Sequence, residues 1–231
     1  MNEIINMTYF IELGLKHINS TQNPDEIKLY DYQHKLLRRL MSEDRMIILK
    51  ARQIGITILF LLYALYKAHN NRGYVTYFVF LNNSQISYFR KILIEALNKM
   101  GITDNFGDNR NKIAFDNGSL VYLVDQMHGD VGVANFVYVD EYASYLSDFK
   151  YDKYETIEKL VIASTAERSD TKFHKLWKEN KNGLGAFYPV RLPYNVHPDR
   201  NADWLEKHQS FLVKKTIKSE LKCKFIKDKA K

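Results

Sequence analysis

Residues 45 to 57 read RMIILKARQIGIT, in which a short apolar run is followed by a loop with a glycine and a threonine. The apolar run predicts a buried strand over residues 45–50, and the apolar residues after the loop predict a helix from about Thr57 to His69. A strand, a glycine-containing loop and a helix in this order can wrap backbone N–H groups around phosphate at the helix N-terminus. The stretch therefore predicts an α/β fold with a phosphate-binding loop.

The loop departs from the usual pattern G-x-x-x-x-G-K-[ST]. Gly55 and Thr57 align with the second glycine and with the hydroxyl that holds magnesium. Ile56 stands in place of the lysine, and Lys50 stands in place of the first glycine. Arg52 offers a second cation, and the backbone around the phosphates would come from Gln53, Ile54, Gly55, Ile56 and Thr57.

Lys50 is the residue expected to replace the missing lysine. A lysine is a point charge on a flexible stem, so the position that its ammonium reaches matters more than the residue that carries it. Because the two ends of a wrapped loop lie close together, we expect Lys50 to reach the phosphates from the opposite side. The segment also fits a strand that ends in Lys-Ala-Arg, followed by a chance Gly-x-Thr.

The composition predicts one soluble, intracellular domain. A chain of 231 residues with 45% hydrophobic and 26% charged residues is typical of a folded globular protein. A single cysteine, Cys223, excludes an internal disulfide and fits a reducing cytoplasm. The longest apolar run, residues 58–65, is about half the length of a membrane span.

The net charge of +7 is concentrated at the C-terminal end. Residues 204–231 contain nine lysines and three acidic residues, within a helical region predicted over about 203–231. Such a basic end favours a polyanionic partner such as nucleic acid, because lysines near phosphates release condensed counterions. A solvated amphipathic helix with a lysine-rich end is the alternative interpretation.

Short β-rich runs alternate with helical patterns along the rest of the chain. This alternation is typical of a mostly parallel sheet with crossover helices, whose ligands bind at the carboxyl ends of the strands. The expected strands cover residues 74–81, 135–145, 159–167 and 187–194, with a hairpin around Asn117-Gly118 in residues 111–125. The expected helices cover residues 84–100, with Ser84 as the N-cap, and residues 172–180.

Two of these strands end in residues suited to nucleotide hydrolysis. Asp140, after the strand that begins at residue 135, is placed to hold Mg²⁺ through water, together with Thr57. Glu141 would act as the general base on the water that attacks the γ-phosphate. A Ser-Thr pair, Ser164 and Thr165, ends the next strand. Taken alone, the Asp-Glu pair also fits the simple end of a strand.

Residues 29–37, LYDYQHKLL, precede the first strand and predict a contact with the base. The amide of Gln33 can read the adenine edge, and Tyr32 or Tyr30 can stack on the ring. The alternative is an amphipathic helix start with Gln33 in solvent.

Taken together, the motifs resemble the ATPase domain of large terminase subunits, the DNA-packaging motors of tailed bacteriophages. The resemblance covers about residues 28–227, and R-Q-x-G-x-T followed by x-Y-V-D-E-x-A is its most specific part. The motifs follow in the family's order: DYQ (31–33), KARQIGIT (50–57), FDNGS (115–119), FVYVDEYA (136–143), IASTA (162–166) and IKSELKCKFI (217–226).

The resemblance implies a P-loop NTPase-type three-layer sandwich that hydrolyses ATP with Mg²⁺. It makes Gln33 the adenine-sensing residue, Arg52 the loop arginine, Asp140 the magnesium ligand and Glu141 the catalytic residue. Lys50 matches the lysine that some terminases carry at the first position of a deviant loop. The coupling motif, which links hydrolysis to DNA movement, would be Ser164, Thr165 and Ala166.

The partners implied by the resemblance are double-stranded DNA, the portal protein and the small terminase subunit. The motor would act as a homo-oligomeric ring in the host cytoplasm, with the isolated chain monomeric, and without a membrane.

The sequence departs from the family in two places. Many terminases supply an arginine finger from an Arg-Gly pair before the acidic strand, but this chain has Val131-Gly132 there. Arg52, Arg168 and Arg191 are candidates for that role. The chain also has no room for a nuclease domain, which predicts an isolated motor domain or a nuclease on another chain. A helicase-like DNA-dependent ATPase and a nucleotide-binding assembly domain with little turnover are the alternative functions.

Overall fold

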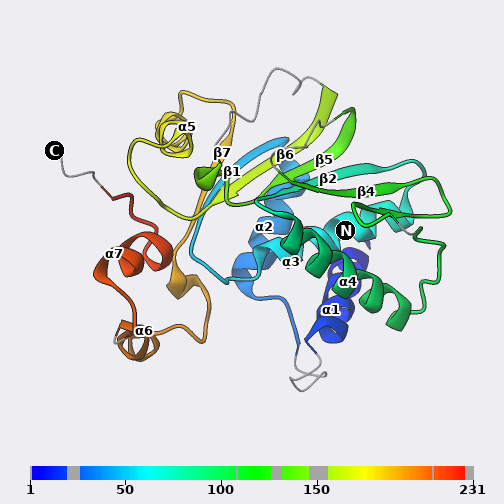
Figure 1. Ribbon diagram of the computed structural model, residues 1–231, viewed down its shortest axis with the longest axis horizontal. Helices are drawn as coiled ribbons and strands as arrows, with labels where there is room; N and C mark the ends of the chain where they lie inside the picture. Colours follow the sequence, from blue (N-terminus) through cyan, green and yellow to red (C-terminus); the bar gives the residue numbers. More distant parts are fainter. Residues whose placement is uncertain are drawn as a thin grey trace.

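The chain folds around a seven-stranded sheet with helices on both faces (Figure 1). The computed structural model describes residues 2–19, 27–107, 109–125, 132–145, 156–209 and 211–226. The strands lie in the order β3-β4-β2-β5-β6-β1-β7, and all neighbours are parallel except the antiparallel pair β3 and β4. Their bounds are β1 (Arg45–Lys50), β2 (Val75–Phe80), β3 (Lys112–Ala114), β4 (Leu120–Asp125), β5 (Ala134–Val139), β6 (Ile157–Ser164) and β7 (Tyr188–Leu192).

The three strands β5, β6 and β1 are neighbours near the centre of the sheet, and they are buried on both faces. This burial explains their nearly continuous apolar sequences, since alternate residues of a strand face opposite layers of helices. Phe136 and Tyr138 of β5, for example, are fully buried. The predicted α/β class with a mostly parallel sheet is confirmed.

Helix α3 (Ile56–Asn70) follows the phosphate-loop segment and is apolar on nearly all sides. It contacts both the sheet and α1 (Asn2–Ile18), which also packs against α4 (Asn83–Lys99). Figure 1 shows α1, α3 and α4 on one side of the sheet and α5 (Lys172–Lys181) on the other. The sequence predicts no helix before residue 29, so α1 is an addition, and its packing explains why α3 has no polar face.

The predicted hairpin joins β3 and β4 through Asn117-Gly118, and Gly118 has a φ of 84°. The side-chain amide of Asn117 donates to the carbonyls of Ala68 and His69, at 2.8 and 3.1 Å. The hairpin turn therefore also satisfies carbonyl groups at the C-terminal end of α3.

Several predicted boundaries are wrong. The N-cap of α4 is Asn82 and not Ser84, because the Asn82 carboxamide oxygen accepts the Gln85 N–H at 3.1 Å. The strand predicted over residues 135–145 ends at Val139 and gives way to a 3₁₀ turn (Tyr142–Ser144), because Glu141 adopts a left-handed backbone conformation. The strand predicted over residues 159–167 begins two residues earlier, at Ile157, and ends at Ser164, in the pair of small hydroxyl residues where its end was predicted.

The predicted C-terminal helix is broken. It consists of α6 (Ala202–Gln209), a short α7 (Lys214–Thr216) and a π-helical turn (Ile217–Leu221). The break lets Leu205 pack against Ile217 and Leu221 in a small hydrophobic cluster separate from the main core, which a continuous helix would prevent. Among the described residues, no helix has the length and apolar character that crossing a bilayer requires.

Candidate nucleotide-binding site

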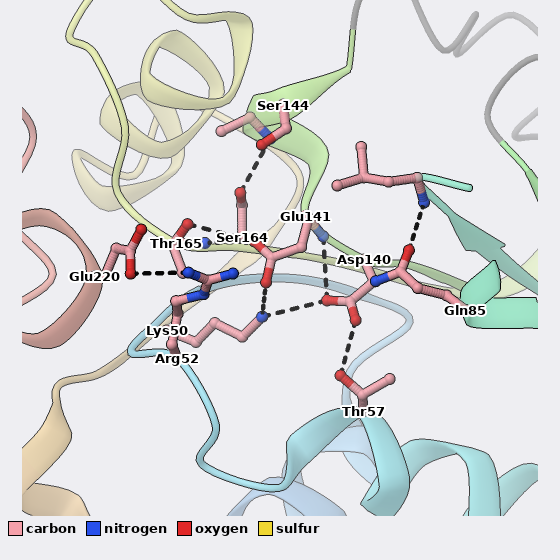
Figure 2. A network of polar contacts seen from close by, with 12 residues as sticks. Lys50, Arg52, Thr57, Gln85, Asp140, Glu141, Ser144, Ser164, Thr165 and Glu220 are labelled. Atoms are coloured by element: carbon pink, nitrogen blue, oxygen red, sulfur yellow. Dashed lines mark hydrogen bonds and ion pairs between the residues drawn. The ribbon is translucent and has the colours of Figure 1, made fainter. Parts of the chain in front are cut away.

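The predicted site residues meet at the carboxyl ends of three adjacent strands. Lys50 is the last residue of β1, Asp140 follows β5, and Ser164 ends β6, which lies between those two strands. Figure 2 shows the Lys50 side chain reaching between Glu141 and Asp140, with Thr57 against the other side of Asp140. Parallel pairing therefore brings together residues that are about 90 positions apart in the chain.

Lys50 is a buried cation, with 5% of its surface exposed. Its ammonium donates to the Glu141 carboxylate and lies 3.4 Å from Oδ1 of Asp140. Burial alone would lower the pKa of Lys50, but Asp140 and Glu141 outweigh it and raise the pKa above the usual value. The lysine is therefore charged and lies beside the carboxylates, at the loop end opposite the helix.

Glu141 is held as a carboxylate by two neighbours. Its Oε2 accepts from the backbone N–H and the hydroxyl of Thr165, both at 3.3 Å. Burial opposes its ionisation, but Lys50 and the Thr165 N–H outweigh burial and lower the pKa of Glu141. A φ of 50° at Glu141 turns the chain sharply after β5. The ionised form is the one that a general base requires.

Asp140 and Thr57 form the part of the site that fits a magnesium ion. Oγ1 of Thr57 donates to Oδ2 of Asp140 at 2.8 Å, and Oδ1 of Asp140 accepts the Tyr138 hydroxyl at 3.2 Å. Mg²⁺ prefers hard oxygen ligands and commonly takes one or two carboxylates together with substrate phosphates and water. A buried carboxylate beside a hydroxyl at the start of α3 suits that pattern.

The loop between β1 and α3 surrounds a cavity of about 180 Å³. Gln53 and Gly55 both have left-handed φ angles, 56° and 73°. The glycine tolerates this conformation freely, whereas at Gln53 it is unusual, and the sequence did not indicate it. The first N–H groups of an α-helix have no partners within the helix and are therefore suited to bind anions, which applies to the start of α3 beside this cavity. The cavity is lined by Lys50, Ala51, Gln53, Ile54, Gly55, Ile56, Thr57 and Ile58.

Gln33 and Tyr32 lie on α2 (Asp31–Ser42), and their side chains are next to this loop. Gln33 is 5% exposed, which rules out the alternative that it points into solvent. Its Oε1 accepts the Tyr30 N–H at 3.0 Å, and a Cβ at Gly55 would lie 3.3 Å from its Nε2. The Tyr32 ring is buried, and its hydroxyl donates to the Ile54 carbonyl at 2.5 Å. Both side chains therefore contact or adjoin the loop.

A second cavity, of about 280 Å³, lies between this helix, the loop and α1. His197 lines it, with its ring centroid 4.5 Å from that of Tyr30. Burial and Arg200 lower the pKa of His197, which favours the neutral ring. Sequence reasoning missed His197, because no local pattern connects it with the distant residues that line the same cavity. The remaining lining includes Leu15, Ile18, Tyr32, Gln33, Gly55 and Ile58.

The predicted coupling residues connect β6 to the acidic pair. The hydroxyl of Ser164 accepts the Ala143 N–H at 3.0 Å, and Thr165 holds Glu141 as described above. Ala166 is buried. The end of β6 therefore contacts both Glu141 and the 3₁₀ turn that follows it.

The three candidate finger arginines have partners within this chain. Arg52 has an exposed side chain that pairs with Oε2 of Glu220 at 3.1 Å. Arg168 pairs with Asp170, and Arg191 donates to the Lys222 carbonyl at 2.6 Å. Val131, the position of the usual finger, lies outside the described residues.

The fold matches solved structures, although no protein-family model and no curated protein matches the sequence. The large terminase ATPase domain of Thermus phage P74-26 matches with a TM-score of 0.67 and 14% identity, over 86% of this chain and 94% of that one. The large terminase of bacteriophage HK97 matches with a TM-score of 0.65 and 16% identity, over 84% and 44%. The large terminase of a thermophilic bacteriophage, in complex with ADP, matches with 0.64 and 12%, over 84% and 52%.

The chain thus spans nearly all of the P74-26 domain and about half of each of the other two terminase chains. At such low identities the likeness concerns the fold. The protein has the α/β fold of the ATPase domains of phage large terminases, as the resemblance in its sequence motifs predicts.

Proposed function

We propose that this chain is a motor domain that hydrolyses ATP with Mg²⁺ to move double-stranded DNA into a phage procapsid. The observation that carries the proposal is the network of Lys50, Asp140 and Glu141 beside the N-terminus of α3. An ammonium, two carboxylates and a helix N-terminus at one sheet edge suit phosphoryl transfer to water. The fold shared with phage large terminases, one of them crystallised with ADP, supports ATP as the nucleotide.

In this reaction Lys50 and the backbone N–H groups of the loop hold the phosphates. Thr57 and Asp140 would hold Mg²⁺, partly through water, and the bound ion would neutralise negative charge on the phosphates. Glu141 orients the attacking water and accepts its proton on the carboxylate. Gln33 and the tyrosines near it contact the base, and Arg52 is a further cation at the loop.

Lys50 also links phosphate binding to the availability of the base. Its ammonium donates to the same Glu141 carboxylate that must accept the proton. A γ-phosphate held in the loop competes for that ammonium and leaves the Glu141 oxygen free for water. Thr165 keeps the other Glu141 oxygen in place, which gives β6 a direct contact with the reacting group.

The proposed partners are those of a packaging motor: double-stranded DNA, the portal protein and the small terminase subunit. The motor would work as a homo-oligomeric ring in the host cytoplasm. The shared fold supports these partners, and the lysines after residue 204 support contact with a polyanion.

Measuring ATP hydrolysis with Mg²⁺ and duplex DNA tests the proposal. We expect Glu141→Gln to lower kcat by about 10²- to 10⁴-fold while nucleotide still binds, because the general base is lost and the loop and Lys50 that hold the phosphates remain. Lys50→Ala should abolish both binding and hydrolysis. Glu95→Gln on α4, which replaces a half-exposed acid paired with Lys91, is the matched control and should leave the rate unchanged.

Three results would redirect the assignment. Hydrolysis that survives both Lys50→Ala and Glu141→Gln would contradict the proposed site. Nucleotide binding without turnover, even at concentrations that allow ring formation, would favour an assembly module. Strand separation of a duplex oligonucleotide would favour a helicase-like ATPase.

A further inference from the structure

Arg200 contacts the phosphate-binding loop from a distant part of the sequence. Its Nη1 donates to the Arg52 carbonyl at 2.9 Å, and its Nη2 donates to the Gln53 carbonyl at 2.6 Å. Nearly 150 positions separate Arg200 from these two residues. The guanidinium thus spans two consecutive carbonyl groups of the loop, which its planar fork suits and a lysine does not.

These two contacts affect the orientation of the peptide groups in the loop, and therefore its ability to bind phosphate. A peptide unit points its N–H and its C=O in opposite directions, so a loop that turns N–H groups inward must turn carbonyl groups outward. Gln53 adopts a left-handed conformation with a φ of 56°, which costs energy for a residue with a Cβ. A charged donor on the outer side of the Arg52 and Gln53 carbonyls stabilises that arrangement.

Arg200 is itself held in place. Its guanidinium lies over the Trp204 ring, 4.9 Å from the ring centroid, and Trp204 stacks on Tyr194 and His208. Trp204 also packs against the small cluster of Leu205, Ile217 and Leu221. The packing of Trp204 therefore restricts the position of the Arg200 guanidinium.

The C-terminal segment, from Arg200 onward, contacts the loop at a second place. The Arg52 N–H donates to the Glu220 carbonyl at 2.9 Å, and the Arg52 guanidinium pairs with the Glu220 carboxylate. Arg52 and Gln53 are thus anchored from outside the loop by residues of the C-terminal segment. Gln53 and the residues that directly follow it line the cavity.

We propose that Arg200 is a positioning residue of the nucleotide site. It holds the Arg52 and Gln53 carbonyls outward, so that the N–H groups from residue 53 onward face the phosphates. The inference rests on the nucleotide site proposed above. It predicts that Arg200 controls nucleotide affinity without touching the nucleotide.

The test compares Arg200→Ala, Arg200→Gln and Arg200→Lys with Arg45→Ala. Arg45 lies at the start of β1, at the opposite end of the strand from the loop, and also donates to two consecutive carbonyls, those of Ile157 and Glu158 at 2.7 and 2.8 Å. Affinity for a fluorescent ADP analogue and for ATP-gamma-S is measured by anisotropy, with the melting temperature recorded without nucleotide.

We expect Arg200→Ala and Arg200→Gln to weaken nucleotide binding by about tenfold to a hundredfold, because each loses hydrogen bonds from a charged donor. Arg200→Lys should bind with intermediate affinity, since one ammonium can serve one carbonyl well. Arg45→Ala should lower the melting temperature at unchanged affinity. In hydrolysis assays KM should rise more than kcat falls, because the loop binds the ground state and the transition state alike.

Equal affinity of wild type and a folded Arg200→Gln variant would overturn the inference and leave the proposed function standing. Absence of nucleotide binding by the wild type itself would overturn both. If Arg200→Ala does not fold, the comparison between Arg200→Lys and the wild type decides, since unchanged affinity for Arg200→Lys would then contradict the need for the fork.

Discussion

At the carboxyl end of β1, Lys50 holds together two carboxylates that would otherwise repel each other. The three charged groups are mostly buried, and each carboxylate has a second partner, Thr57 for Asp140 and Thr165 for Glu141. Removing one member of a buried charged group is costly, because the remaining charges stay desolvated without compensation. The proposed catalytic residues are therefore also residues on which folding depends.

The pH dependence of stability tests this network. In the wild type the lowered pKa of Glu141 contributes stability above its ordinary pKa of 4.5, and that stability is lost as the pH falls below it. The raised pKa of Lys50 contributes stability below its ordinary value of 10.5 and loses it above. In Lys50→Met the Glu141 carboxylate lacks the cation that lowers its pKa, so burial is no longer compensated and its ionisation opposes folding.

We therefore expect the melting temperature of Lys50→Met, measured by circular dichroism without nucleotide, to fall further below the wild type as the pH rises from 4 to 7. Near pH 7 the free energy of unfolding of Lys50→Met should be about 3 kcal/mol or more below that of the wild type. Lys67→Met, which removes a partly exposed pair with Glu3, is the control and should show a small, constant difference. A gap that does not widen with pH would contradict the proposed charge network.

At the scale of single elements, local sequence patterns predicted most of the sheet and failed at its connections. The strand at residues 45–50 and the hairpin at Asn117-Gly118 were predicted correctly, because continuous apolar runs and tight turns are local signals. Helix α1 was missed, and the predicted C-terminal helix is broken after Gln209. Helix α1 depends on packing against α3 and α4, and the break lets Leu205 pack against Ile217 and Leu221, so both depend on tertiary packing that periodicity does not record.

The residues of the candidate site likewise fall into those that a local motif predicts and those that only tertiary structure brings to the site. The residues of the loop and the two strand ends could be proposed because each lies in a short motif. His197 and Arg200 belong to no motif, and only the pairing of β7 with β1 brings the segment that follows β7 to the loop. Arg52 was predicted as a loop cation, but the sequence did not indicate that Glu220 binds it.

The start of α4 can be tested by mutation, because Ser84 was predicted as its N-cap and Asn82 is the N-cap in the structure. The Asn82 side chain accepts the Gln85 N–H, whereas the exposed Ser84 hydroxyl only donates to Asn82. We expect Asn82→Ala to lower the free energy of unfolding by about 1 kcal/mol and Ser84→Ala by less than about 0.5 kcal/mol. Urea denaturation measures both, and a larger loss for Ser84→Ala would reverse the N-cap assignment.

Within the described part of the chain, the buried hydrophobic residues form a large cluster and a small one. The main core surrounds the sheet, and the small cluster consists of Leu205, Ile217 and Leu221 with partly buried neighbours. The small cluster supports Arg200 and Glu220, which hold the loop. Segments with few buried apolar contacts open at lower free energy than a central core. The contacts of Arg200 and Glu220 with the loop are therefore expected to break and re-form while the sheet stays folded.

Hydrogen exchange on two leucine variants tests this separation. Leu205→Ala should speed exchange in residues 202–221 and in loop residues 51–53, because the loop loses its outer support, while β5 and β6 stay protected. Leu62→Ala, in the main core, should instead destabilise the whole protein by about 2–5 kcal/mol and speed exchange throughout. If Leu205→Ala shifts the global unfolding transition as far as Leu62→Ala does, the two clusters unfold as one, and nucleotide affinity could not be tuned through the C-terminal segment alone.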